Sequence, residues 1–89
     1  MSDLDARFEQ AQADVKNIKA RPSNDDLREL YGLYKQATVG DAAASGAKRP
    51  GRLDLLGRAK YDAWTAKDGM TADDAKQDYI GVVERLLAG

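Results

Sequence analysis

The sequence predicts an all-α fold, a bundle of four helices in a single domain that spans residues 1–89. Apolar residues recur at steps of three and four along four segments, which is the period of an amphipathic helix. Glycine or proline separates these segments, and serine or threonine stands before several of them as a candidate cap. We find no strand pattern and no internal repeat, so helices account for the apolar residues.

The first predicted helix begins near Leu4 and ends before Pro22. Ser2 is its expected N-cap, because a serine oxygen can accept a hydrogen bond from a free N–H group of the first turn. Pro22 ends the helix, since the residue before a proline avoids the helical region. Its apolar stripe contains Leu4, Phe8, Ala11, Val15 and Ile18.

The second predicted helix spans about residues 24–39, with a boundary error of a few residues. Ser23 is its expected N-cap, and Asp26 stands three positions later, which is the spacing of a capping box. Gly40 ends the helix. Its shared face contains Leu27, Leu30, Tyr31, Tyr34 and Thr38.

The third and fourth predicted helices follow a long loop that runs from Gly40 to about Leu53. The third helix spans roughly residues 54–67, and Gly69 ends it. Thr71 caps the fourth helix. The third helix has an apolar side with Leu56, Ala59, Ala63 and Trp64, and the stripe of the fourth contains Ala75, Tyr79, Val82 and Leu86.

The composition excludes several kinds of site. The sequence has no histidine and no cysteine, so the common zinc sites and the serine–histidine and cysteine–histidine nucleophile pairs are excluded. A net charge of -1 gives no general attraction to nucleic acid. The polar first residues and the lack of a long apolar run predict a soluble chain, compatible with the cytosol.

One face of the second helix is a candidate binding site. Tyr31, Tyr34 and Lys35 stand at i, i+3 and i+4, which places two rings and a cation on one side. A flat anionic ligand such as a nucleotide suits this face, because bases stack on rings and lysine serves phosphates. The competing interpretation is that both tyrosines belong to the core with their hydroxyls at its rim.

Three further residues have similar competing interpretations. Lys60 stands four residues before Trp64, and a helical lysine is usually solvated with its stem along apolar surface. Tyr79 lies on the apolar stripe of the fourth helix, where a core role is the default. Lys16 is a surface lysine on periodicity alone.

The block from Tyr31 to Asp41, YGLYKQATVGD, closely resembles the signature of the acyl-CoA-binding protein family. The similarity continues in order along essentially the whole chain. The other matching positions are Phe8, Val15 and Lys16, the segments 21–23, 49–51 and 57–64, and the last helix from Ala75 to Ile80.

The resemblance implies an up-down-down-up four-helix bundle with a long overhand connection between the second and third helices. It implies non-enzymatic, reversible binding and transport of medium- to long-chain fatty acyl-CoA in the cytoplasm. It also implies transient contact with acyl-CoA-using enzymes and membranes. We expect no cofactor, no metal and no nucleic acid, and a monomeric chain.

The resemblance also implies roles for individual residues. Tyr34 is expected to stack on the adenine ring. Tyr31, Lys35 and Lys60 are expected to hold the 3′-phosphate region of CoA. Lys16 and Tyr79 are expected to contact the head group and the inner part of the acyl chain. Further residues expected at or beside the ligand are Ala11, Leu27, Arg28, Gly32, Leu33 and Leu56.

Among the departures from the family pattern, two concern the ligand site. Leu56 stands where the family usually has a lysine near the CoA phosphates, and Arg28 stands where an apolar residue near the acyl groove is usual. These departures favour an alternative, a helical protein-interaction module with a weakened acyl-CoA site. A thioesterase is a third hypothesis, although its nucleophile or acid–base pair would have to come from residues other than histidine and cysteine.

Overall fold

The computed structural model describes residues 3–89 and forms only helices within them, so the predicted N-cap Ser2 lies outside the described residues. None of the helices in this range combines the length and the apolar character that crossing a bilayer requires. The elements in order are α1 (Asp3–Asp14), the 3-10 turn η1 (Val15–Asn17), α2 (Asn24–Thr38), α3 (Ala42–Ser45), α4 (Leu55–Thr65) and α5 (Ala72–Ala88).

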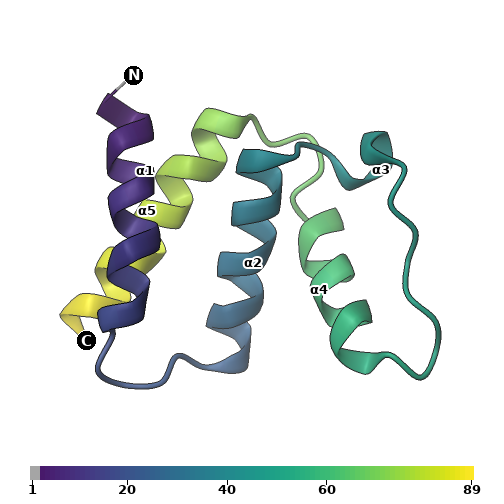
Figure 1. The fold of residues 1–89 in the computed structure, drawn as a ribbon, viewed down its shortest axis with the longest axis horizontal. Helices are drawn as coiled ribbons and strands as arrows, with labels where there is room; N and C mark the ends of the chain where they lie inside the picture. Colours follow the sequence, from purple (N-terminus) through teal and green to yellow (C-terminus); the bar gives the residue numbers. More distant parts are fainter. Residues whose placement is uncertain (1–2) are drawn as a thin grey trace.

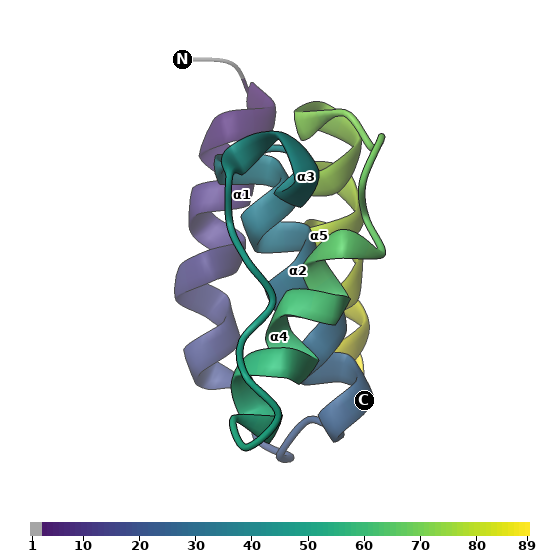
Figure 2. The ribbon, with the colours of Figure 1, turned by 90° about the vertical axis from the view of Figure 1, so that its right-hand side faces the viewer.

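The four long helices have the predicted up-down-down-up arrangement (Figure 1). Helices α1 and α5 run in one direction, and α2 and α4 run in the opposite one. The overhand connection between α2 and α4 contains the short helix α3 and passes along α4 (Figure 2). This topology confirms the predicted fold class.

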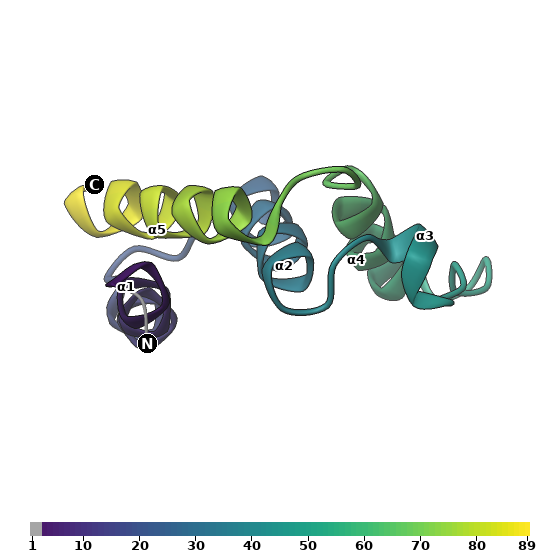
Figure 3. The same cartoon turned by 90° about the horizontal axis from the view of Figure 1, so that it is seen from above.

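The bundle is flat, with principal extents of 36 × 30 × 16 Å. Helix α2 packs against α5 on one side and α4 on the other, while α1 packs mainly against α5. Seen from above, the helices form a thin row rather than a square bundle (Figure 3). One face of α2 therefore remains open between α1 and α4.

The main core fills the junction of α1, α2 and α5. Phe8 and Tyr79 meet edge to face at its centre, with 5.1 Å between their ring centroids. The buried members of this core are Phe8, Ala11, Leu30, Leu33, Ala75, Tyr79, Ile80 and Val83. Most of them belong to the predicted apolar stripes, which identified the buried faces of α1 and α5. On α2 the predicted face is mostly exposed, at Leu27, Tyr34 and Thr38, and Leu33 is buried in the core instead.

Trp64 anchors α4 outside this core. Its side chain is buried, and its Nε1 donates a hydrogen bond of 2.7 Å to the carbonyl oxygen of Gly40. The indole therefore joins α4 to the end of α2. Trp64 belongs to the predicted apolar side of this helix, and its burial makes it a packing residue.

The predicted capping residues begin α2 and α5. The Ser23 hydroxyl accepts a hydrogen bond of 3.1 Å from the Asp26 N–H group, and Thr71 accepts one of the same length from Asp74. Asp54, which we expected as the first helical residue of α4, caps it instead by accepting from the Gly57 N–H group at 2.9 Å. Each cap satisfies an N–H group that has no partner within the helix.

Two boundaries differ from the sequence prediction. Regular helix in α1 ends at Asp14, and after η1 the chain turns extended at Ile18 (φ -67°, ψ 122°), four residues before Pro22. The predicted loop also contains α3, which is bounded by Gly40 and Gly46 with positive φ angles of 97° and 80°. A single turn of helix is too short to show an apolar period.

Candidate functional site

Two open hollows adjoin along the exposed face of α2. The first, the α2–α4 groove, has a volume of about 540 Å³ and is lined by Asn24, Leu27, Arg28, Tyr31, Leu55, Leu56, Ala59 and Lys60. The second, the α1–α2 hollow, has about 370 Å³ and is lined by Gln12, Val15, Leu27, Leu30, Tyr31, Tyr34 and Tyr79. Leu27 and Tyr31 line both, so the two form one continuous concave face.

The α2–α4 groove has an apolar lining beside a cation. Leu55 and Leu56 of α4 face Leu27 of α2 across it. The Nζ atom of Lys60 lies 5.5 Å from the centroid of the Tyr31 ring. This cation–π contact holds the positive charge at the junction of the two hollows without neutralising it.

Aromatic rings dominate the α1–α2 hollow. Tyr34 keeps 39% of its surface exposed and lies 6.3 Å from the Phe8 ring centroid, whereas Tyr79 is buried. Burial, and to a smaller extent the neighbouring Tyr34, raises the pKa of the Tyr79 phenol above its usual value. A tyrosine is already protonated at neutral pH with its ordinary pKa, so the Tyr79 phenol can donate a hydrogen bond there.

Lys35 is a second cation near the space between α2 and α4. Its Nζ atom lies 4.8 Å from the centroid of the Trp64 ring, which is itself fixed by the hydrogen bond to Gly40. Lys35 lines neither hollow, whereas Lys60 of α4 lines the α2–α4 groove. Each lysine lies over a different aromatic ring, and neither contact neutralises the charge that it could offer to an anionic ligand.

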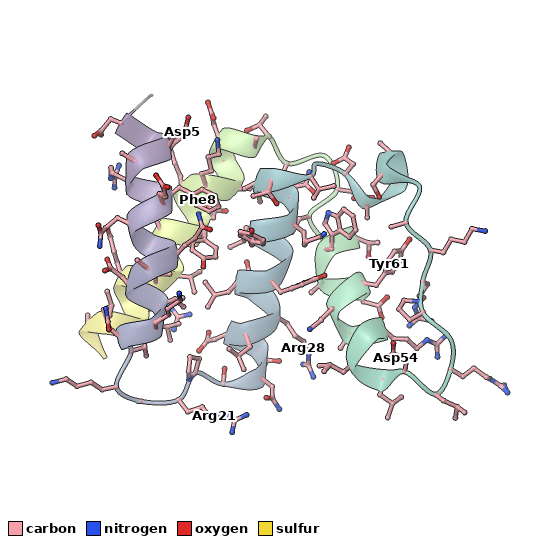
Figure 4. The ribbon with its side chains drawn as sticks, in the orientation of Figure 1. Asp5, Phe8, Arg21, Arg28, Asp54 and Tyr61 are labelled. Atoms are coloured by element: carbon pink, nitrogen blue, oxygen red, sulfur yellow. The ribbon has the colours of Figure 1, made fainter. Side chains whose placement is uncertain are left out.

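Arg28 lies at the boundary between the α2–α4 groove and a third depression. Figure 4 shows its side chain between α2 and α4. Arg28 and Ala59 line both the α2–α4 groove and this third depression. The third depression has a volume of about 530 Å³, and its lining includes the charged residues Asp25, Glu29, Asp62 and Lys67. An exposed ion pair of 3.0 Å joins Arg28 to Asp25. The apolar groove therefore ends at a guanidinium.

The structure brings most of the predicted site residues together. Seven line the continuous concave face, namely Leu27, Arg28, Tyr31, Tyr34, Leu56, Lys60 and Tyr79. Lys16 is exposed on η1 and lines neither hollow, although its neighbour Val15 does. Ala11 and Leu33 are buried in the core, and Gly32 packs against the backbone of Ala63.

Several lining residues were not among the predicted site residues. Gln12 and Val15 stand one turn apart on the first helix, and this spacing could have placed both on one face. Leu55 stands four residues before Ala59, which is a similar signal on α4. Asn24 carries no signal of this kind. Among residues 3–89, no group of three or more histidine, cysteine or acidic side chains could hold a metal ion.

These features define a small helical bundle with an open groove that combines apolar surface, tyrosine rings and lysine charges. A family model described as acyl CoA binding protein matches residues 5–83. The chain belongs to the acyl-CoA-binding protein family, as its signature block predicts.

Relatives from distant organisms are similar over nearly the whole chain. An acyl-CoA-binding protein homolog from Manduca sexta is 52% identical over 85 residues, which cover 96% of this chain and 92% of the relative. Acyl-CoA-binding protein homolog 1 from Caenorhabditis elegans is 48% identical over 81 residues, covering 91% of each chain.

Solved structures share the fold. The crystal structure of Oryza sativa acyl-CoA-binding protein 2 has a TM-score of 0.88 at 42% identity and covers 96% of this chain and 91% of its own. The crystal structure from Moniliophthora perniciosa has a TM-score of 0.85 at 34% identity, covering 99% and 82%. The predicted family and fold class are both confirmed.

Proposed function

We propose that this chain binds one fatty acyl-CoA molecule reversibly and carries it without changing it chemically. The observation that supports this most directly is the contact of Lys60 with Tyr31, where the apolar α2–α4 groove joins the aromatic α1–α2 hollow. Acyl-CoA combines the matching features, since a long apolar chain is linked to an adenine nucleotide with several phosphates. Membership of the family supports the same ligand.

The head group is assigned to the tyrosines and lysines. Tyr34 stacks on adenine, because its ring is the more exposed one in the hollow. Tyr31, Lys35 and Lys60 hold the 3′-phosphate region, as the family resemblance implies, and the two lysines supply the cations. Lys16 and Tyr79 add contacts to the head group and the inner acyl chain.

The acyl chain is assigned to the α2–α4 groove, where Leu27, Leu56 and Ala59 present apolar surface. Each methylene removed from water contributes about 0.8 kcal/mol. Two extra carbons should therefore tighten binding roughly tenfold until the groove is full. The acyl chain of the ligand therefore supplies most of the binding affinity, and the CoA head group supplies the specificity.

The wider role follows from this chemistry. The chain acts in the cytoplasm as a monomeric carrier that meets acyl-CoA-using enzymes and membranes transiently. It needs no cofactor and no metal, and it does not bind nucleic acid. Without histidine or cysteine, a chain of 89 residues has few groups that could cleave the thioester.

Calorimetric titration with palmitoyl-CoA below its micelle concentration tests the proposal, with free CoA and free palmitate as controls. We expect one-to-one binding of palmitoyl-CoA and far weaker binding of both controls. A folded sample that releases no heat with palmitoyl-CoA would refute the proposal and favour the protein-interaction module. A parallel time course of free CoA release should stay at the background rate, and a faster rate would contradict the carrier role.

A further inference from the structure

Arg28 interrupts the apolar wall that α2 gives to the α2–α4 groove. Asn24, Leu27, Arg28 and Tyr31 line the groove at a spacing that places them on one face of the helix. Asn24 and Tyr31 stand seven residues apart in the sequence, so this wall is about 10 Å long. Arg28 stands one helical turn from each of them, and its side chain lies between α2 and α4 (Figure 4). An acyl chain that enters beside Tyr31 therefore meets the guanidinium before it reaches the end of the groove.

The Arg28 guanidinium keeps most of its hydrogen-bonding capacity free. It carries several N–H donors, but within residues 3–89 it makes one hydrogen bond, from its Nη1 atom to Asp25 Oδ1 at 3.0 Å. The side chains of Arg28 and Asp25 are 52% and 93% exposed, so their ion pair adds little stability. A carboxylate brought by a ligand can therefore share the guanidinium with Asp25 or replace it.

The other acids that line the third depression beside Arg28 are held by other cations. Glu29 pairs with Lys67 at 2.6 Å. Asp62 pairs with Arg49 at 2.9 Å. Neither carboxylate forms a hydrogen bond with Arg28 in the described part of the chain. A ligand in the groove therefore competes for Arg28 with one exposed ion pair.

A methyl end and a carboxylate end of an acyl chain meet this arginine differently. A methyl-ended chain that passes Arg28 covers a charged group and offers it no hydrogen bond, which costs free energy. A carboxylate at the end of the chain can pair with the planar guanidinium through two parallel hydrogen bonds. The exposed Asn24 amide lines the same groove and can donate to the same carboxylate.

We propose that the groove accepts acyl-CoA esters whose acyl chain ends in a carboxylate, and that Arg28 binds this terminal carboxylate. The ligand class deepens the proposed acyl-CoA binding and rests on it. Leu27, Leu56 and Ala59 cover the methylenes, as they do for an ordinary fatty acyl chain. Only a chain of matching length places its carboxylate at Arg28, so the effect of the carboxylate depends on chain length.

Calorimetry with pairs of ligands of equal chain length tests the proposal. Palmitoyl-CoA is compared with hexadecanedioyl-CoA, which carries a carboxylate in place of the terminal methyl group, below the micelle concentration of both. Dodecanoyl-CoA and decanoyl-CoA are compared with their dicarboxylic counterparts in the same way. The measured quantity is the affinity of the carboxylate-ended ligand divided by that of its methyl-ended partner, which we call the carboxylate preference. We expect it to peak at one chain length and to fall there as salt rises.

Variants of the ion pair should change the carboxylate preference in opposite directions. Arg28→Leu should lower it by about tenfold or more, because hydrogen bonds to a charged group are lost. Arg28→Lys should recover part of the loss, since it keeps the charge but not the planar fork. Asp25→Asn should raise the preference severalfold, because it removes the competing carboxylate.

Two readouts show that these effects are specific to the carboxylate. Asp25 lies outside the lining of the α2–α4 groove, so Asp25→Asn should bind palmitoyl-CoA as the parent does. The exposed Arg7 also lies outside that lining, and Arg7→Gln should leave the carboxylate preference unchanged. Circular dichroism checks that each variant is folded.

The contrary outcomes have distinct meanings. An equal carboxylate preference in the parent and in Arg28→Leu would overturn the proposal. Such a result, with both ligands weakened alike, would assign Arg28 to a phosphate of CoA. A preference that survives in Arg28→Leu but disappears in Lys60→Gln would also overturn it and assign the carboxylate to Lys60. Parent protein that binds palmitoyl-CoA without any Arg28-dependent preference refutes this inference alone, whereas parent protein that binds neither ligand refutes the carrier function as well.

Discussion

Tyr34 offers the most direct test of the head-group assignment. Its ring is partly exposed at the α1–α2 hollow, and its hydroxyl is not needed for stacking. Tyr34→Ala should weaken palmitoyl-CoA binding by about 1–3 kcal/mol, whereas Tyr34→Phe should bind nearly as the parent does. Calorimetry of both variants measures the difference. If phenylalanine costs as much as alanine, stacking is not what Tyr34 contributes.

Arg28 should limit the length of chain that the groove favours. It separates the apolar groove from a charged depression, so a longer chain would have to pass the guanidinium. Arg28→Leu should raise the affinity for a sixteen-carbon acyl-CoA severalfold relative to a ten-carbon one.

Asp25→Asn is the matched control for Arg28→Leu. It breaks the same exposed ion pair, which contributes little to stability, but keeps the guanidinium in place. The ratio of the two affinities, measured by calorimetry, should stay at the parent's value in Asp25→Asn. An unchanged ratio in Arg28→Leu would show that Arg28 does not limit the length of the bound acyl chain.

The contact of α2 with α4 depends on Gly32. A Cβ atom at this position would lie 2.3 Å from the Ala63 carbonyl oxygen, so the helices would have to separate. Gly32→Ala should lower the free energy of unfolding by about 1–3 kcal/mol. Gly81→Ala is the control on α5, where nothing lies within 4 Å, and it should stabilise by up to about 1 kcal/mol. Urea unfolding measures both, and a neutral Gly32→Ala would contradict the tight contact.

The elements were largely predictable because the local signals agreed with the packing. Ser23 and Thr71 cap α2 and α5 as their positions indicate, and the apolar stripes supply most of the core. The early end of α1 was not predictable, because Pro22 restricts only its immediate neighbour.

Contacts between distant segments were beyond the reach of the sequence pattern. Lys60 lies over the Tyr31 ring, and Trp64 donates a hydrogen bond to the Gly40 carbonyl. Both pairs are too far apart in the sequence for a helical period to connect them. The resemblance to the family supplied the residues of the site, while the structure supplied their arrangement. The boundary role of Arg28 also depends on the relative positions of α2 and α4, which sequence patterns do not give.

At the scale of the molecule, the core is unevenly distributed. The main buried cluster draws its residues from α1, α2 and α5, while α4 is held by Trp64, the Gly32 contact and the Lys67–Glu29 ion pair of 2.6 Å. Segments with fewer buried apolar contacts open more readily. The side of the molecule that forms the groove is therefore its less stable side.

Hydrogen exchange should reveal this difference. Amides of α4 should exchange faster than those of α2 and α5 in the free protein, because α4 can open without disrupting the main core. Palmitoyl-CoA should slow exchange in α4 more than in α5, since the proposed ligand contacts both walls of the groove. Mass spectrometry of the peptides measures the rates. Equal protection of α4 and α5 in the free protein would contradict the uneven core.

Ion pairs between segments should make stability depend on pH. Arg85 lowers the pKa of Asp26 by hydrogen bonding, and Arg49 of the overhand connection does the same for Asp62 of α4. Gln36 and the Gly69 N–H group lower the pKa of Asp41. A carboxyl whose pKa is lower in the folded state stabilises the fold above its unfolded pKa. Stability should therefore be constant near neutral pH and fall as the pH drops below the ordinary value of 3.8.

At basic pH the dependence of stability on pH has the opposite sign. Asp5 raises the pKa of Lys76 by hydrogen bonding, so this pair stabilises the fold below the ordinary value of 10.5 and is lost as the pH rises through the higher folded value. Thermal unfolding across the pH range measures both limbs. Asp26→Asn/Asp62→Asn should flatten the acid limb, and Arg49→Gln/Arg85→Gln should flatten it similarly because the same pairs are lost. Arg7→Gln should leave it unchanged. An acid limb as steep in both double variants as in the parent would mean that these pairs do not govern acid unfolding.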